Sequence, residues 1–553
     1  MRNVKDWYSG GAPWVWLNAG AVAISLVMVA GMLLLIGARG LVHFWPADVV
    51  RFTVEVPGQA PRTVLGEIQS TEMVSVQRLI DAGTELPVSA GEVERLLIKK
   101  GNRDSFGADF EYLIAPFITG QEVQDDVITI ERTEWGNQYG VLVGVSEDGV
   151  PAPEGSDLYA EFQARVVRVL EIRDRIHAIE RGEMSAINYR LEKLRLEERR
   201  LALEGADTAV ALAAIEDERA TLQATFLAQQ QDLGALYVEI ARDSYSLELA
   251  DGRTVTSPME RVVSAIQPNA MGGMAKLGRY ARNIWRFMAD EPREANTAGG
   301  VFPAIFGTVM MVILMSIIVT PFGVVAAVYL REYAKQGVLT QTIRIAVNNL
   351  AGVPSIVYGV FGLGFFVYLI GGSLDRAFYP EGLPAPTFGT PGLIWASLTL
   401  ALLSLPVVIV ATEEGLSRIP STVREASYAL GATKAETLWR IVLPMASPAM
   451  MTGLILAVAR AAGEVAPLML VGVVKLAPSL PLDGNEPFLH LERKFMHLGF
   501  HIYDVGFQSP NVEAARPLVY ATALLLVTVI VVLNLTAVRI RNRLRERYRS
   551  LEH

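Results

Sequence analysis

The chain has 553 residues, no cysteine and a formal net charge of −9, and its mean hydropathy is positive. Disulfides, thiolate metal sites and a cysteine nucleophile are therefore excluded. The charge is unevenly spread, because residues 40–297 carry roughly 27 basic and 42 acidic side chains while the rest of the chain is net positive. This pattern predicts membrane spans joined to a large acidic domain, and it argues against a nucleic-acid partner.

The first predicted element is an apolar run from Trp14 to Ile36, which is long enough to cross the hydrocarbon core of a bilayer. Arg2 and Lys5 precede it, and tryptophans lie near both of its ends. We interpret residues 1–39 as an N-terminal transmembrane anchor. A cleaved signal peptide is the alternative, which is disfavoured because the run is long and no clear small-x-small cleavage site follows it.

Residues 40–297 contain no second span, and they are predicted to form an extracytoplasmic β-rich domain. Short runs rich in β-branched and aromatic residues indicate its strands, namely Arg51–Val56, Thr63–Val76, Val127–Arg132, Tyr139–Val145, Ser244–Ala250 and Arg253–Thr256. Asp251 and Gly252 lie between the last two strands, and an Asp-Gly pair in this position is a strong signal for a β-hairpin turn.

From about residue 157 to 241 the composition becomes helical and highly charged. In the second half of this stretch, positions three and four residues apart indicate a coiled-coil seam with two polar interruptions, at Leu212, Ile215, Arg219, Leu222, Phe226, Gln229, Leu233, Leu236 and Ile240. Residues 204–207 predict a reversal, and Gly182 predicts a break in the first arm. We therefore expect an antiparallel coiled-coil hairpin that can be inserted without disturbing the sheet, with a solvated charged spacer as the alternative.

A basic and aromatic stretch, Ala275–Arg293, is predicted to be a helix along the membrane face. Further apolar runs predict five more spans, at 301–330, 346–371, 391–412, 446–474 and 516–538.

The membrane topology follows from the positive-inside rule, which predicts that the basic loops at 331–344 and 418–440 and the arginine-rich tail lie in the cytoplasm. Both termini are then cytoplasmic, residues 40–297 face outward, residues 298–545 form the transmembrane domain, and residues 546–553 form a cytoplasmic tail.

The stretch Arg424–Pro444 is polar and lies between two predicted spans. Thr422 and Glu425 have the spacing of a helix-capping box, Thr433 and Glu436 repeat it, and Gly431 lies between them at a helix C-cap position. Two short helices joined by a tight turn at the membrane surface are predicted. An ordinary connecting loop is the alternative.

Arg460 and Glu464 are ionisable residues inside the apolar run Leu454–Leu470. Their spacing places them on one helix face, and charged groups at this depth usually face a pathway or a partner. A guanidinium suits a phosphate-like oxyanion, and the carboxylate would hold the arginine or prevent overly tight binding. A static ion pair between helices is the alternative interpretation.

His490, His497 and His501 cluster in a loop predicted to face outward, and the last two have helical metal-ligand spacing. No carboxylate pattern completes a site, so a metal is disfavoured. The chain has no GxxxxGK[ST] sequence, and we expect no ATP hydrolysis by the chain itself.

Several stretches resemble one family, the phosphate-specific ABC importer permeases of the PstA type. Glu425-Ala426-Ser427, Gly431, Ile441, Leu443 and Pro444 match the spacing of the EAA loop, with Ser427 in place of an alanine. The segment Gly463–Leu468 resembles the family's GETAPL segment, with Val465 in place of threonine. Pro321–Ala334 and Asn349–Gly359 are also similar to the family. The resemblance covers about residues 298–545, and the large extracytoplasmic insertion is typical of its longer members.

The resemblance implies a mainly α polytopic protein of the inner membrane with six transmembrane helices and the type I ABC importer permease fold. It implies phosphate uptake and places Glu464, with Arg460 beside it, on the phosphate pathway. The EAA residues named above would couple the chain to its ATPase. The implied partners are a second permease subunit (PstC type), ATPase subunits (PstB type) that bind ATP and Mg²⁺, and a periplasmic phosphate-binding protein (PstS type). No cofactor is expected on the chain itself.

Two other functions remain open at this point. A permease for another oxyanion, such as molybdate or sulfate, would share the transport machinery, and the GEVAPL sequence argues only weakly against it. A membrane-anchored scaffold or sensor built on the coiled coil would not need the EAA spacing.

Overall fold

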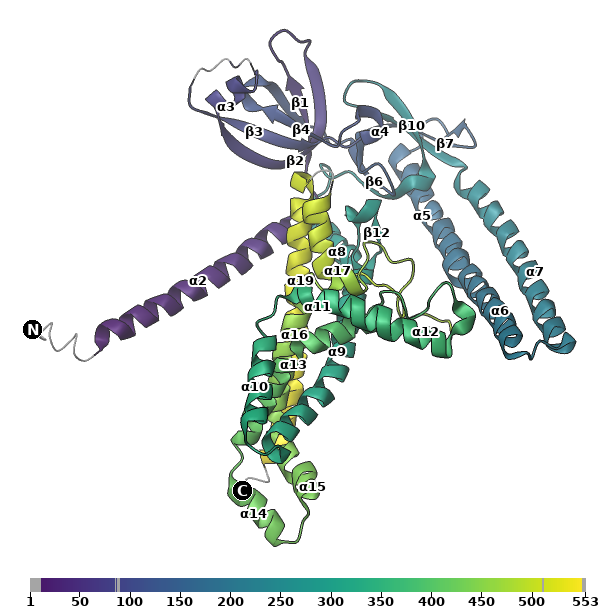
Figure 1. The fold of residues 1–553 in the computed structure, drawn as a ribbon. Helices are drawn as coiled ribbons and strands as arrows, with labels where there is room; N and C mark the ends of the chain where they lie inside the picture. The colour runs from purple at the N-terminus through teal and green to yellow at the C-terminus, as the bar shows by residue number, and fades with distance from the viewer. Residues whose placement is uncertain (1–10, 85, 87–89, 510–511, 550–553) are drawn as a thin grey trace, which may run out of the picture.

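The computed structural model describes residues 11–84, 86, 90–509 and 512–549. A β-rich region with two long helical arms lies at one end of a bundle of apolar helices (Figure 1). The first helix, α2 (Ala12–Val42), contacts the last helix near Gly40, where an added Cβ would lie 2.9 Å from the carbonyl oxygen of Tyr520. The remainder of α2 projects away from the bundle (Figure 1). The basic residues that precede this predicted span, Arg2 and Lys5, lie outside the described residues.

The first sheet has five antiparallel strands in the order β4-β3-β2-β1-β5. Its strands are β1 (Val49–Val54), β2 (Arg62–Ser75), β3 (Glu92–Lys99), β4 (Phe110–Ile114) and β5 (Ile118–Val123), with the short helices α3 (Val76–Asp81), α4 (Arg103–Phe106) and η1 (Ala115–Phe117) between them. Alternate apolar side chains of these strands form one buried cluster that includes Phe52, Ile98 and Leu113. Burial on one face explains why the strands alternate in polarity.

The second sheet has the order β10-β9-β7-β6-β11, with β8 paired to β7. Its strands are β6 (Val127–Arg132), β7 (Gln138–Glu147), β8 (Val150–Pro151), β9 (Asp243–Glu248), β10 (Thr254–Pro258) and β11 (Val262–Ile266), and η3 (Met259–Arg261) precedes the last of them. All six predicted strands are present within about two residues, and Gly252 has the positive φ of a turn residue. Strands β3, β4, β5 and β11 were not predicted from the sequence.

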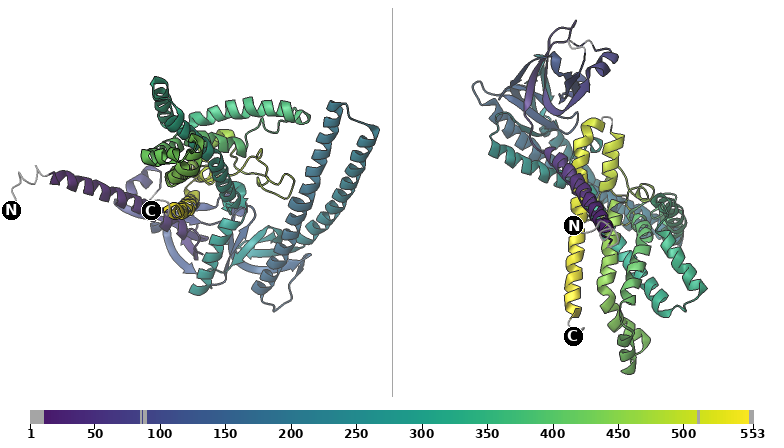
Figure 2. Two further views of the ribbon diagram at one scale, coloured as in Figure 1. Left: turned by 90° about the horizontal axis from the view of Figure 1, so that it is seen from below. Right: turned by 90° about the vertical axis from the view of Figure 1, so that its left-hand side faces the viewer.

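Two helical arms leave this second sheet after β8 and return to it at β9. The first arm consists of α5 (Leu158–His177), a π-helical segment η2 (Ala178–Met184) and α6 (Ser185–Glu204), and the second is α7 (Ala209–Ile240). The predicted break at Gly182 is the π-helical segment, and the predicted reversal occurs at Gly205, which has a φ of 66°. Figure 2 shows the arms running side by side.

None of the predicted seam positions of α7 is exposed. Ile215, Leu236 and Ile240 are buried, and the other seam positions of α7 are half-buried. Arg219, a polar interruption of the seam, donates to Glu198 on the first arm at 2.5 Å. Because β7 and β9 are neighbouring strands, the arms begin and end at one place in the sheet.

Helix α8 (Gly273–Ala289) lies between the β-rich region and the bundle. It is followed by β12 (Pro292–Arg293), η4 (Glu294–Asn296) and β13 (Ala298–Gly299). Its apolar residues Tyr280, Ile284 and Phe287 pack with Phe44 and Leu518. Some of its basic residues pair with acidic residues of the β-rich region, among them Arg286 with Glu131 at 2.9 Å and Lys276 with Asp48, whereas Arg282 is exposed. Its position along the membrane face stays a prediction.

Among the described residues, six helical segments are long and apolar enough to cross a membrane, in agreement with the sequence. They are Pro13–Val42, Phe302–Tyr333, Ser355–Phe378, Leu393–Ser417, Lys434–Gly463 and Ala515–Arg543. The individual elements are α9 (Phe302–Val328), η5 (Tyr329–Tyr333), α10 (Val338–Leu350), α11 (Ser355–Phe361), η6 (Gly362–Gly371), α12 (Gly372–Phe378), η7 (Pro380–Gly382), α13 (Leu393–Ser417), α14 (Ser421–Ala429), α15 (Lys434–Thr437), η8 (Leu438–Val442), α16 (Leu443–Gly463), α17 (Leu468–Val471), α18 (Leu498–Tyr503), η9 (Asp504–Gln508) and α19 (Val512–Arg549). The last residues of the predicted tail, 550–553, lie outside the described residues.

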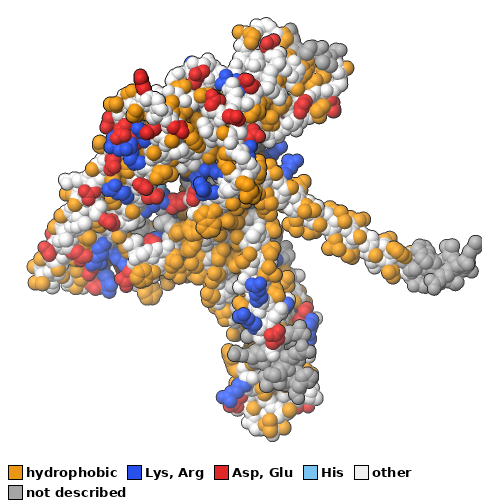
Figure 3. All heavy atoms as spheres, turned by 180° about the vertical axis from the view of Figure 1, so that it is seen from behind, with side chains coloured by type: hydrophobic (Ala, Val, Ile, Leu, Met, Phe, Trp, Pro, Cys, Tyr) orange, Lys and Arg blue, Asp and Glu red, His pale blue; other side chains and the backbone are white. Residues whose placement is uncertain are grey.

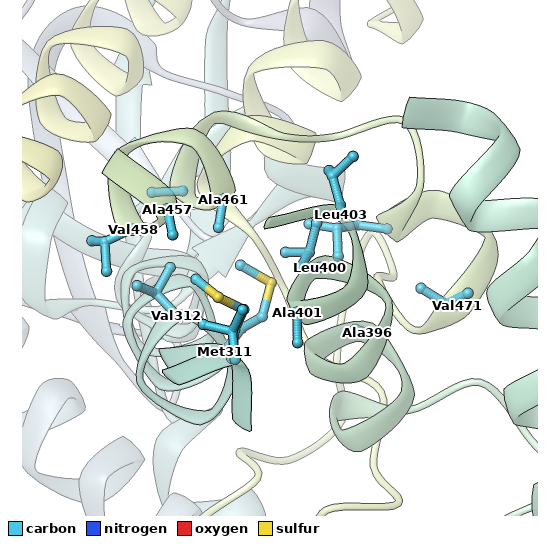
Figure 4. Packing of buried hydrophobic residues seen from close by; sticks show 14 of the residues in the cluster. Met311, Val312, Ala396, Leu400, Ala401, Leu403, Ala457, Val458, Ala461 and Val471 are labelled. Carbon is cyan, nitrogen blue, oxygen red and sulfur yellow. The ribbon is translucent and has the colours of Figure 1, made fainter. Parts of the chain in front are cut away.

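Helix α13 is the centre of the bundle. Met311 and Val312 of α9, Leu400 of α13 and Ala457 of α16 point toward one another in its core (Figure 4). Small residues permit close contact between these helices: an added Cβ on Gly453 would lie 2.7 Å from Ala411 Cβ. The outer faces of the helices are apolar, whereas charged side chains gather on the β-rich region, on the arms and at the far end of the bundle (Figure 3).

Candidate functional site

Arg460 and Glu464 are brought together at the end of α16. The Arg460 Nε and Glu464 Oε1 atoms are 3.5 Å apart, and the two side chains are 32% and 20% exposed. The prediction that both lie within one span is wrong, because α16 ends at Gly463 and Glu464 has an extended backbone with φ −79° and ψ 134°. Pro467 has no N–H to donate to the carbonyl of Gly463, and glycine itself is a poor helix former, so the helix cannot continue here.

The Gly463–Leu468 segment packs against the segment Asn349–Gly359. An added Cβ on Gly359 would lie 2.7 Å from Pro467 Cα, so only glycine allows this approach. Beside it, Tyr358 is buried, and its hydroxyl donates to the carbonyl of Leu350 at 2.6 Å. Two stretches that the sequence singled out separately therefore form one site, a contact that no local sequence signal could indicate.

The stretch Arg424–Pro444 forms two short helices, α14 and α15, at the end of the bundle opposite to the β-rich region (Figure 1). The capping box of Thr433 and Glu436 is confirmed, and Gly431 has a φ of +87°. The capping box predicted for Thr422 and Glu425 is wrong. Helix α14 begins at Ser421 after Pro420, so Thr422 is already inside the first turn.

The residues of this stretch that were predicted to contact an ATPase differ in their exposure. Glu425, Ala426 and Gly431 are exposed. Ser427 is buried, and its hydroxyl lies 2.8 Å from that of Thr437, which joins α14 to α15. Ile441, Leu443 and Pro444 are half-buried where η8 continues into α16. The exposed group is therefore free to contact another molecule, and the rest supports it.

Glu332 and Arg424 form a connection that the sequence analysis missed. The guanidinium of Arg424 donates to Glu332 Oε1 at 2.7 Å and to the carbonyls of Ile419 and Leu416 at 2.8 and 3.0 Å. The ammonium of Lys434 donates to the carbonyl of Glu332. Because Glu332 belongs to η5, both short helices are fixed to the end of α9. The only available signal was the pair of charges in Pro321–Ala334, directly after a span.

The predicted histidine cluster lies in and after the long loop Gly472–His497 between α17 and α18, which we call the α17–α18 loop. His490 is buried, and its ring nitrogens lie 3.0 Å from Asp483 Oδ1 and 3.1 Å from Glu492 Oε1. Burial lowers the pKa of His497 and of His501 to about 4. The described residues contain no group of three or more His, Asp or Glu side chains that could hold a metal ion.

Comparison with known proteins identifies the bundle. Residues 319–549 match the family model of the binding-protein-dependent transport system inner membrane component. The chain is 36% identical over 248 residues to a phosphate transport system permease protein PstA 1 of Mycobacterium tuberculosis, covering 44% of this chain and 71% of that protein. It is 38% identical over 195 residues to PstA of Mycobacterium leprae, covering 35% of this chain and 58% of that protein. It is 30% identical over 258 residues to a probable ABC transporter permease protein of Bacillus subtilis, covering 46% of this chain and 81% of that protein.

Six apolar helices, a buried central helix and an exposed pair of short helices with the EAA spacing thus belong to the permease subunit of an ABC transporter, a multi-pass protein of the inner membrane. Such a subunit is not itself an enzyme, since ATP is hydrolysed by partner ATPases. Within this class, the chain belongs to the family of PstA-type phosphate permeases.

Proposed function

We propose that the chain forms part of the transmembrane pathway through which an ATP-driven importer takes up inorganic phosphate, and that Arg460 and Glu464 line this pathway. A single observation supports the pair. Among the described residues, the Arg460 guanidinium contacts only one acidic group, Glu464, and does so at 3.5 Å. A guanidinium has five N–H donors, so a partly exposed one with such a loose contact retains donors for an oxyanion.

The chain would work with a second permease subunit of the PstC type and with two ATPase subunits of the PstB type, which bind ATP and Mg²⁺. A periplasmic binding protein of the PstS type would deliver phosphate. The exposed residues Glu425, Ala426 and Gly431 would seat in a cleft of the ATPase. The ion pair of Glu332 and Arg424 would then pass the closure of the ATPases on to α9.

The proposed topology places both termini in the cytoplasm and residues 40–297 in the periplasm. The basic loops support it, as does the position of α14 and α15 at the end of the bundle opposite to the β-rich region (Figure 1). We also propose the division into an anchor (1–39), an extracytoplasmic domain (40–297), a permease domain (298–545) and a tail (546–553).

The two arms are proposed to form an antiparallel coiled coil. Burial of Leu194 on the first arm and Ile215 on the second supports this, as does the ion pair of Arg190 and Glu218 at 2.6 Å between the arms.

The pathway is tested with Arg460→Gln and Glu464→Gln in the complete complex in liposomes. We expect Arg460→Gln to reduce phosphate uptake per assembled complex by about ten- to a hundredfold, since hydrogen bonds from a charged donor are lost. Glu464→Gln should give a smaller loss through slower release of the anion. A suitable control is Arg344→Gln, which breaks the ion pair with Glu413 at 3.0 Å between α10 and α13.

The control variant should reduce assembly and leave uptake per assembled complex unchanged. If Arg460→Gln and Glu464→Gln behaved like the control, the pair would be a structural brace and the pathway would lie elsewhere.

A further inference from the structure

The first arm of the β-rich region reaches the α17–α18 loop of the permease. The hydroxyl of Tyr189 donates to the carbonyl of Glu486 at 2.6 Å, and the ammonium of Lys193 donates to the same carbonyl at 2.9 Å. The rings of Tyr189 and His490 meet edge to face, with centroids 5.7 Å apart. A carbonyl oxygen accepts two hydrogen bonds, so that of Glu486 is saturated by α6. Helix α6 also contacts η7, directly after α12 (Figure 1).

The tip of the α17–α18 loop is held together as one unit. His490 lies between Asp483 and Glu492, and the guanidinium of Arg493 donates to Asp483 and to the carbonyl of Leu480 at 2.9 Å. Burial alone would raise the pKa of Asp483, but the bond and charge of Arg493, the amide of Asn485 and the charge of His490 together lower it. Asp483 therefore stays charged and keeps its partners, and a force on Glu486 moves the whole tip.

The backbone of the same loop at Leu491 and Arg493 is hydrogen-bonded to the permease core. The amides of Leu393 and Ile394, at the start of α13, donate to the carbonyls of Arg493 and Leu491, both at 2.9 Å. At the start of α18, an added Cβ on Gly499 would lie 2.6 Å from Cγ2 of Val465, the residue next to Glu464. The loop thus connects the contact with α6 to the central helix and to the segment that carries the pathway glutamate.

The other end of the first arm, helix α5, is packed in the core of the second sheet. Phe162, Val169 and Ile176 of α5 are buried in the core of the second sheet, together with Leu236 and Ile240 of α7. Close-packed protein interiors transmit displacement. A movement of the β-rich region, such as one caused by a protein that docks on it, would therefore reach the α17–α18 loop through α6.

We propose that α6 acts as a strap on the permease, in which Tyr189 and Lys193 are positioning residues that set the place of the α17–α18 loop during transport. This inference rests on the proposed transport function. The sequence indicated only that the arms can be inserted without disturbing the sheet, and the strap gives them a part in transport. The strap acts through Glu486 and His490 and touches no substrate.

The test uses the complete complex in liposomes, with phosphate uptake and binding-protein-stimulated ATPase activity measured per assembled complex. Tyr189→Phe removes the hydroxyl but keeps the ring on His490, and we expect about a two- to tenfold loss of uptake, as for one hydrogen bond. The double variant Tyr189→Ala with Lys193→Met should lose more. Tyr237→Phe is the matched control, because its hydroxyl bonds to Glu180 within the arms at 2.6 Å and does not reach the permease.

A second measurement uses the absence of cysteine in the chain. Lys193→Cys with Glu486→Cys allows a short cleavable thiol crosslinker to tether the strap to the loop, while Arg190→Cys with Glu218→Cys tethers only the two arms. We expect uptake by the first pair to be reduced before crosslinking, because the bond from Lys193 is lost, and to be restored by the tether until it is cleaved. The second tether should leave uptake unchanged.

Normal uptake by the double variant, or a first tether that fails to restore uptake, would overturn the strap while leaving the transport function intact. An unmodified complex that moved no phosphate would overturn the proposed function and the strap with it.

Discussion

Gly431 shows how a single residue can be required for its backbone alone. Its φ is +87°, yet no heavy atom lies within 4 Å of an added Cβ. A Cβ at this position would therefore meet no neighbour. The requirement comes from the left-handed backbone conformation, which costs non-glycine residues about 1–2 kcal/mol.

We expect Gly431→Val to assemble and insert normally but to lose most binding-protein-stimulated ATPase activity, because a β-branched residue disfavours this turn and would displace α14 relative to α15. Gly431→Asn is the control, since asparagine tolerates left-handed backbone and should retain activity. Full stimulation of the Val variant would show that the turn has no mechanical role.

For single residues, the sequence predicts contacts between residues that lie close together in the chain. The capping box of Thr433 and Glu436 and the turn at Gly431 depend on neighbouring residues, and both were predicted. The pairing of Glu332 with Arg424 and the contact of Gly359 with Pro467 join distant segments, so no spacing rule could indicate them. The Thr422 capping box failed because α14 begins at Ser421, so Thr422 lies inside the first turn and does not precede the helix.

Among whole elements, α8 shows how the β-rich region is fixed to the permease. Arg286 Nη1 lies 2.9 Å and Arg279 Nη2 3.9 Å from Glu131 Oε2, and Arg293 pairs with the same carboxylate. Burial alone would raise the pKa of Glu131, but the positive charges of Arg286 and Arg293 outweigh burial and lower it to about 2. One carboxylate thus holds three arginines at the joint.

A folded-state pKa below the ordinary value means that this stabilisation is present above about pH 4.5 and is lost as the pH falls toward about 2. We expect Glu131→Gln to lower the thermal unfolding midpoint of the purified complex by several degrees at pH 7 and to weaken its dependence on acid pH. Glu134→Gln is the control, because Glu134 is 57% exposed and 3.5 Å from Arg261. Equal midpoints for the two variants would contradict a joint that depends on Glu131.

The elements themselves were largely predictable. A run rich in β-branched residues identified β6, the three-four spacing identified positions of α7 that are not exposed, and hydropathy identified all six candidate spans. Strand β5, whose residues are mostly exposed, and the short strand β4 have little apolar alternation to detect. The end of α16 was misplaced because apolar residues continue to Val474, although the helix ends at Gly463.

For the whole molecule, the structure joins three regions that the sequence presents separately. The β-rich region contacts the permease through the joint at Glu131 and through α6, and the α17–α18 loop leads from α6 to Val465 beside Glu464. The exposed pair α14 and α15 lies at the opposite end of the bundle (Figure 1). The α17–α18 loop contacts the start of α13, and α14 and α15 are fixed to the end of α9, which packs against α13.

The most direct test of this account is transport by the complete complex in liposomes, comparing labelled phosphate, sulfate and molybdate under the same ATP supply and with the binding protein present. We predict phosphate uptake that requires both ATP and this chain, with little uptake of the other two anions. Uptake of sulfate or molybdate without phosphate, in a complex that hydrolyses ATP normally, would contradict the assignment of phosphate as the cargo.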